Sequence, residues 1–195
     1  PRKLLETALE KHPNEVDIWV ALSVIAVRQE RSEDALKILD DAEKKLGDQL
    51  EIRLARARFW AGRGGADASV ALAKLTSNTS KFSAIERVQL YNGVADGYLR
   101  IGDITSAAAL WSTLAKEQPN NLQIRLILFD SAILTGNVEG METALQEIRR
   151  IEGEEGTLWR YARARILLQN AKERNDPAYV EARSMLQSIV LRRPA

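Results

Sequence analysis

Apolar residues recur along the chain at intervals of three and four, the spacing that gathers them on one face of an α-helix. Two early runs show this spacing: Trp19, Leu22, Val24, Ile25 and Val27, and then Ala35, Leu36, Ile38, Leu39 and Ala42. No sustained alternation of apolar and polar residues, which would indicate half-buried strands, interrupts the pattern. The pattern therefore predicts an all-α chain built from short amphipathic helices.

The pattern also repeats with a period of 34 residues. Lys3-Leu4-Leu5 returns 34 positions later as Lys37-Ile38-Leu39, and Gly102-Asp103 returns as Gly136-Asn137. Trp19 and Tyr91 are 72 positions apart, two periods plus four, which places a four-residue insertion within residues 50–87. The spacing from Pro13 to Pro194 requires seven more residues, which fit best at 169–176. A period of this length is typical of helical repeat arrays.

Turn residues divide each period into two helices. Gly102 suits the left-handed conformation that ends a helix, and Asp103 offers an oxygen to cap the next one. Gly136-Asn137 has the same chemistry, whereas Glu30-Arg31 in the first period lacks it. Each repeat is therefore predicted to be two antiparallel helices joined by a short turn.

The repeat resembles the tetratricopeptide repeat family, whose pattern runs Trp, Leu-Gly, Tyr, then Ala, Phe and Pro. The third repeat matches it best, with Tyr91, Val94-Ala95, Tyr98, Gly102-Asp103, Ala107, Trp111 and Pro119. Trp19 and Trp159 hold the aromatic position in the first and fifth repeats, and Arg125 replaces it in the fourth. The second repeat has Ile52 or Arg53 there, so its register is open by one residue. The resemblance implies a right-handed α-α superhelix (solenoid) of about five helix-turn-helix repeats.

We therefore expect one tetratricopeptide-like domain over residues 1–195. Its expected segments are 1–13 (the second helix of a truncated repeat), 14–49, 50–87 (irregular), 88–121, 122–155 and 156–195. Ser, Thr and Asn replace the repeat pattern at 76–87, where we expect a longer loop or an altered helix start. Neither end has the polar capping helix usual in repeat arrays, which indicates a segment excised from a longer array. Such uncapped ends can self-associate.

Composition narrows the possible functions. Lys and Arg total 28 against 27 Asp and Glu, a formal net charge of +1, which argues against bulk electrostatic binding to nucleic acid or acidic membranes. The absence of cysteine and the single histidine, His12, exclude thiolate and multi-histidine metal sites. The longest apolar stretch, residues 18–27, is too short to span a bilayer. No catalytic constellation is found, so we expect neither enzymatic activity nor a cofactor or metal.

Two motifs stand out beside the repeat. Gly62-Arg63-Gly64-Gly65 lacks the Lys-Ser/Thr of a phosphate-binding loop and is interpreted as a turn between helices. Arginine outnumbers lysine 19 to 9, with clusters at Arg53, Arg56, Arg58 and Arg63 and at Arg160, Arg163 and Arg165. Two interpretations of these clusters remain open. One is ion pairing between helices, and the other is a site for carboxylate or phosphate groups.

The family binds peptides in a concave groove lined by the first helix of each repeat. The resemblance implies these groove residues here: Asp17, Val20, Val24, Arg58, Asn92, Asp96, Leu99, Leu126, Asp130, Ile133 and Arg160. Their mixture suits an extended peptide or a helix with some basic character. The clamp for a C-terminal carboxylate found in chaperone-binding members is disfavoured, because Val20 and Val24 occupy its positions.

The sequence therefore predicts a non-catalytic scaffold for a protein or peptide partner, with no nucleic acid and no membrane insertion. One alternative is an accessory repeat array of a larger enzyme or cell-envelope assembly. Another is a helical-repeat RNA binder, against which the groove carboxylates Asp96 and Asp130 count.

Overall fold

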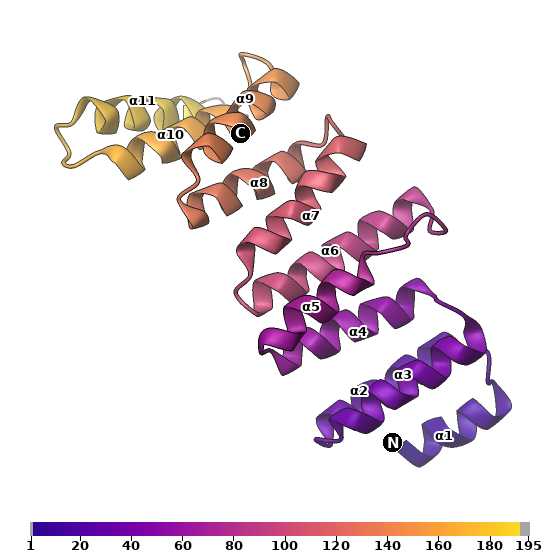
Figure 1. Cartoon of the computed structure of the whole chain (residues 1–195). Coiled ribbons are helices and arrows are strands. Elements are labelled where there is room, and N and C mark those ends of the chain that lie inside the picture. The colour runs from indigo at the N-terminus through magenta and orange to yellow at the C-terminus, as the bar shows by residue number, and fades with distance from the viewer. Residues whose placement is uncertain (1, 192–195) are drawn as a thin grey trace. The chain divides into compact units, whose positions relative to one another are not determined.

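The computed structural model describes residues 2–191, which form helices and their connecting turns (Figure 1). In that range the helices are α1 (Arg2–Lys11), α2 (Val16–Arg28), α3 (Ser32–Leu46), α4 (Leu50–Arg63), α5 (Ala66–Leu75), α6 (Ala84–Arg100), α7 (Ile104–Glu117), α8 (Leu122–Thr135), α9 (Val138–Glu152), α10 (Leu158–Asn170) and α11 (Pro177–Leu191). The described residues contain no strand. The predicted all-α class is thus confirmed. Pro194 and the other expected positions at 1 and 192–195 lie outside the described residues.

The chain divides into two compact units between Leu110 and Trp111, within α7. In unit 1, α2 packs against α1, α3 and α4, and α4 in turn packs against α5 and α6. In unit 2, α8 packs against α9, α9 against α10, and α10 against α11. Each unit is therefore a stack of antiparallel helix pairs. The expected repeat boundaries stay a prediction.

The turns between paired helices form as the glycines predict. Gly102 and Gly136 have φ of 80° and 67°, in the left-handed region that favours glycine. The Asp103 carboxylate accepts a hydrogen bond from the Ser106 N–H at 3.0 Å. The Asn137 side chain accepts one from the Gly140 N–H at 2.9 Å. Each glycine thus ends one helix, and the residue after it caps the next.

The first repeat makes the same turn without a glycine. Glu30 has φ of 60°, and the Arg31 N–H bonds to the carbonyl of Ala26 at 2.9 Å. The Asp103 N–H bonds to the carbonyl of Tyr98 at the same distance. The sequence predicted a turn between two helices here but showed none of the usual turn residues, because the packing of α2 on α3 rather than the preference of Glu30 holds the chain reversal.

The irregular segment contains both features expected of it. After α5 ends at Leu75, a loop runs to Ser83, and α6 extends over 17 residues, compared with 13 in α2. Ser83 and Glu86 form a capping box, in which each side chain accepts a hydrogen bond from the other's backbone N–H. The late insertion falls in the loop between α10 and α11.

Candidate functional site

Three consecutive first helices of unit 1 form a shared surface, because α4 contacts both α2 and α6. Two hollows lie along it. The α2–α4 hollow has a volume of about 280 Å³ and is lined by Ser23, Val24, Val27, Arg28, Ala35, Leu39, Ala55, Arg58 and Phe59. The α4–α6 hollow has a volume of about 120 Å³ and is lined by Leu54, Ala57, Arg58, Ala61, Gly93, Asp96, Gly97 and Arg100. Arg58 belongs to both, so we treat the two hollows as one α2–α4–α6 groove.

Glycines on α6 set the depth of the α4–α6 hollow. A Cβ built on Gly93 would collide with the side chain of Leu54. A Cβ on Gly97 would lie 2.9 Å from Cδ2 of Leu72. At Gly97 the added Cβ would meet the fully buried Leu72, so this position requires glycine at the present helix spacing, whereas at Gly93 it would meet the end of the flexible Leu54 side chain. Neither glycine was among the predicted groove residues, although a spacing of four on one first helix indicates a close helix contact.

Predicted groove residues of unit 1 gather at these hollows. Val24 and Arg58 line the α2–α4 hollow, and Asp96 faces Arg58 across the α4–α6 hollow. Leu99 is exposed on α6, and Val20 is half-buried against the core around Leu39 and Ile52. The two remaining residues, Asp17 and Asn92, are exposed on α2 and α6. The prediction thus includes three residues that line the hollows.

In the second repeat, whose register the sequence left open, Leu54, Ala57 and Arg58 line the groove. Arg53 instead lies buried, with its guanidinium hydrogen-bonded to Asp48 and to the carbonyls of Leu75 and Ser77. Arg53 is therefore a structural residue, whereas Arg58 and Arg63 of this cluster are exposed, with Arg63 lying over the ring of Trp60.

Two further arginines at the groove were not predicted. Arg28 lies in the last turn of α2 and Arg100 in the last turn of α6. They are 72 positions apart, the same offset that relates Trp19 to Tyr91. This offset was the signal that could have found them, but a basic residue in a last helical turn is ordinarily explained by the helix dipole.

Four charged side chains of the groove have no ion pair or hydrogen bond to any other described residue: Arg28, Arg58, Arg100 and Asp96. Elsewhere on α4 the arginines are engaged. Arg56, for example, pairs with Asp40 at 2.7 Å and with Glu43 at 2.5 Å. The ion-pairing interpretation therefore holds for Arg53 and Arg56, and Arg58 is left for the alternative.

The predicted residues of unit 2 are engaged within that unit. Asp130 forms an ion pair with Arg165, whose guanidinium lies over the ring of Phe129. Arg160 donates hydrogen bonds to three backbone carbonyls of the loop before α10, those of Glu154, Glu155 and Gly156. Leu126 and Ile133 are half-buried against the core of the unit. Structural contacts thus account for all four residues.

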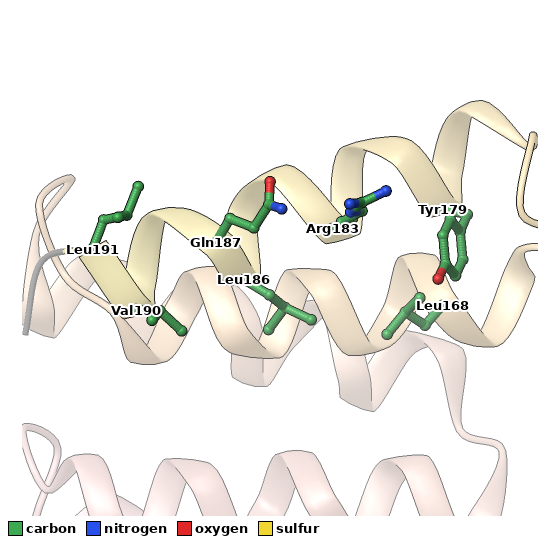
Figure 2. Close-up of a pocket in the computed structure, with 7 residues that line it drawn as sticks. All are labelled: Leu168, Tyr179, Arg183, Leu186, Gln187, Val190 and Leu191. Carbon is green, nitrogen blue, oxygen red and sulfur yellow. The ribbon is translucent and has the colours of Figure 1, made fainter.

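Unit 2 contains an apolar hollow of about 760 Å³ between α10 and α11 (Figure 2). It is lined by Leu168, Tyr179, Arg183, Leu186, Gln187, Val190 and Leu191. In Figure 2 Leu186 and Val190 point from α11 toward α10, whereas Leu191 points away from it. Val190 and Leu191 are 70% and 85% exposed, so this hollow has an apolar rim open to solvent.

Residues 2–191 include no cluster of three or more His, Asp or Glu side chains that could hold a metal ion. Within the same residues, no helix combines the length and the hydrophobicity that crossing a membrane requires.

Stacked antiparallel helix pairs of this kind define the helical-repeat class of proteins. Residues 2–59, from α1 into α4, match the sequence model of the tetratricopeptide repeat. Over this stretch the chain is therefore similar to the tetratricopeptide repeat, as its pattern of aromatic and small residues predicted.

A solved structure with a similar fold is the monomeric mutant of IFIT1 with Gppp-AAAA. It is 16% identical, with a TM-score of 0.48, over 96% of this chain and 44% of that one. This chain thus spans less than half the length of that protein. No curated protein matches the sequence.

Proposed function

We propose that the α2–α4–α6 groove binds a segment of a partner protein. Tetratricopeptide repeats generally mediate protein–protein interactions and are generally non-catalytic. One observation carries the proposal: Arg58 lines both hollows of the groove and has no partner among the described residues. An unpaired cation beside an apolar hollow can both anchor and orient a bound segment.

The two parts of the groove would contribute differently to binding. An apolar side chain of the partner enters the α2–α4 hollow, where Val24 and Val27 are 39% and 43% exposed. Burial of that side chain supplies most of the affinity. Asp96 and Arg58 then select and orient polar groups of the segment along the α4–α6 hollow. The walls are helices in mutual contact, so binding needs little ordering of the groove.

RNA binding is the less favoured function for this groove. Sequence-specific RNA recognition stacks unpaired bases on aromatic rings or guanidinium planes. Among the residues that line the two hollows, Phe59 is the single aromatic, and it is only 7% exposed. The groove therefore offers an aliphatic hollow and no exposed aromatic ring, which leaves its guanidinium planes as the surfaces on which a base could stack. An accessory array of a larger enzyme or envelope assembly remains compatible with the same groove, because such arrays also hold protein segments.

A comparative pull-down tests the proposal. The chain is used as bait in a lysate of the source organism, beside a variant with Val24→Glu and Asp96→Arg. Both positions are exposed, so the variant is expected to fold. The control bait carries Lys37→Glu on α3, an exposed position outside the groove.

A protein retained by the native and control baits but lost from the groove variant supports the proposal, and mass spectrometry then names the partner. Equal retention on all three baits contradicts it.

A further inference from the structure

We propose that the segment bound in the α2–α4–α6 groove is acidic. An aliphatic side chain occupies the α2–α4 hollow, and carboxylates on either side of it pair with Arg28, Arg58 and Arg100. This inference rests on the proposed function of the groove and adds the chemistry of the partner.

The charge balance of the groove carries the inference. Three arginines line its hollows against one carboxylate, Asp96. None of these four groups is paired with another described residue. A guanidinium offers several N–H donors in a plane, which match the two oxygens of a carboxylate. The groove therefore presents donors that nothing in the described part of the chain satisfies.

The arginines follow the groove in order. Arg28 lines the α2–α4 hollow, Arg58 lines both hollows, and Arg100 lines the α4–α6 hollow. The α2–α4 hollow has the larger apolar lining, with Val24, Val27 and Leu39, whereas Leu54 and two alanines line the α4–α6 hollow. A matching segment therefore carries its aliphatic anchor toward one end, and its acidic residues extend from that anchor toward α6.

The acidic segment proposed here differs from the partner with some basic character that the sequence favoured. That expectation depended on the two groove carboxylates, Asp96 and Asp130. Asp130 is neutralised by Arg165 within unit 2. Asp96 shares its hollow with Arg58 and Arg100, so the local balance is positive. An acidic segment is then attracted, and a basic one is repelled.

The phosphates of an RNA could pair with the same arginines. The α2–α4 hollow, however, favours a protein segment over an RNA. An aliphatic side chain fills that hollow and loses its contact with water, which is favourable. A nucleotide base finds no exposed ring there, because Phe59 is buried. The combination of arginines and an aliphatic hollow thus favours an acidic protein segment.

Selection from a random-peptide display library provides the test. The whole chain is the target, and the most enriched peptide is synthesised with a fluorophore for anisotropy titrations. Two comparison probes are used. One is the same peptide with lysine in place of each acidic residue, and the other is a polyuridine RNA. Enriched peptides are expected to carry Asp or Glu around an aliphatic residue. Binding is expected to weaken as salt is raised.

Variants then connect the selected peptide to the arginines. Arg58→Ala is expected to weaken binding about fivefold, because the ion pair it removes is partly exposed. Joint reversal of Arg28, Arg58 and Arg100 to Glu is expected to weaken it by about a hundredfold. Lys37→Glu changes the net charge outside the groove and is expected to leave affinity within about twofold. Arg58→Ala removes no contact within the chain and is expected to unfold at the temperature of the native chain. The joint reversal also places Glu in the last turns of α2 and α6, where the helix dipole disfavours it, so its unfolding temperature is expected to fall by a few degrees while circular dichroism shows a folded protein.

Each other outcome contradicts the inference in a distinguishable way. Peptides that bind at Val24 but are basic, or that are insensitive to the arginines, overturn the acidic chemistry and leave the groove as the binding site. Arginine-dependent binding of polyuridine with no selected peptide assigns the groove to nucleic acid. Failure of every probe to bind overturns both the acidic partner and the proposed function.

Discussion

The guanidinium of Arg53 donates two hydrogen bonds to the carboxylate of Asp48, from Nε at 2.7 Å and from Nη2 at 2.5 Å. Its Nη1 donates to the carbonyls of Leu75 and Ser77, each at 2.7 Å. Arg53 also lies 5.0 Å from the ring centre of Phe82. The buried side chain of Arg53 on α4 thus links the loop before α4 to the irregular loop after α5 through hydrogen bonds.

Replacing Arg53 is expected to be costly. Arg53→Met leaves two loop carbonyls without their donor and Asp48 with Lys81 alone, and we expect a loss of about 2–4 kcal/mol in unfolding free energy. Arg56→Met is the matched control, because its partners Asp40 and Glu43 are more exposed, and we expect a loss of about 1 kcal/mol or less. Urea denaturation measures both. Equal losses would show that Arg53 does not anchor the loop.

The same ion pair predicts a dependence on pH. The hydrogen bond from Arg53, helped by Lys81 and opposed by burial, lowers the pKa of Asp48 from 3.8 to about 2. The stabilisation is complete above the ordinary pKa of 3.8 and is lost as pH falls through about 2, because the unfolded chain takes up the proton first. Urea denaturation through this pH range is expected to show a steeper acid loss in the native chain than in Asp48→Asn. Parallel curves for the two proteins would contradict the assignment.

Glu30 should be a site of stored backbone strain. Its φ of 60° is costly for a residue with a side chain, so Glu30→Gly is expected to raise the unfolding free energy by about 0.5–1 kcal/mol. Gly102→Ala places a side chain at φ of 80° with no neighbour within 4 Å, so it should cost about 1 kcal/mol through conformation alone. Urea denaturation midpoints measure the change in stability of both variants, Glu30→Gly and Gly102→Ala. A destabilising Glu30→Gly would mean that the side chain contributes more than its strain costs.

Gly93 is expected to control the contact between α4 and α6. Gly93→Ala introduces a methyl group against the end of the Leu54 side chain, and the cost of displacing that half-buried side chain is partly offset by the helix preference of alanine, so we expect a net loss of up to about 1 kcal/mol. Gly62→Ala on α4 provides the opposite control, since nothing lies within 4 Å of the added Cβ and alanine favours a helix. The thermal unfolding temperature should therefore fall for Gly93→Ala and rise for Gly62→Ala. A neutral Gly93→Ala would show that Leu54 moves aside freely.

Self-association through unit 2 stays a prediction, and the α10–α11 hollow gives it a location. Val190 and Leu191 expose apolar surface at its rim, and such surface associates readily in water. Sedimentation velocity of the native chain is expected to show a dimer that dissociates on dilution. Val190→Glu with Leu191→Glu should yield a monomer without a change in thermal stability. A native chain that is monomeric at high concentration would exclude this contact.

Arg125 shows how a degenerate repeat position keeps its structural role. The Trp19 indole donates to the carbonyl of Pro13 at 3.1 Å, and the Arg125 guanidinium donates to the carbonyl of Pro119 at 3.1 Å. Both pairs are six residues apart, at equivalent places in their repeats. The sequence identified Arg125 as a departure from the family pattern. Its contact shows that a long cationic side chain can replace the aromatic one.

The sequence alone could predict the helix pairs, their turns at Gly102 and Gly136, and the irregular segment at 76–87. Each depends on residues close together in the chain, where helical spacing and backbone preference act directly. Val24, Arg58 and Asp96 could be placed on the groove because repeat position determines which side of a first helix a residue occupies. The same local reasoning could not show whether a charged side chain already has a partner.

Pairing of charges was decided by the tertiary structure. Asp130 and Arg165 are 35 positions apart and meet through the packing of unit 2, whereas Arg58 finds no carboxylate among the described residues. Ion pairing depends on the distance between side chains of different helices, which periodicity does not encode. Arg53 and Arg58 are therefore alike in sequence, yet one is buried in a loop anchor and the other is open to a partner.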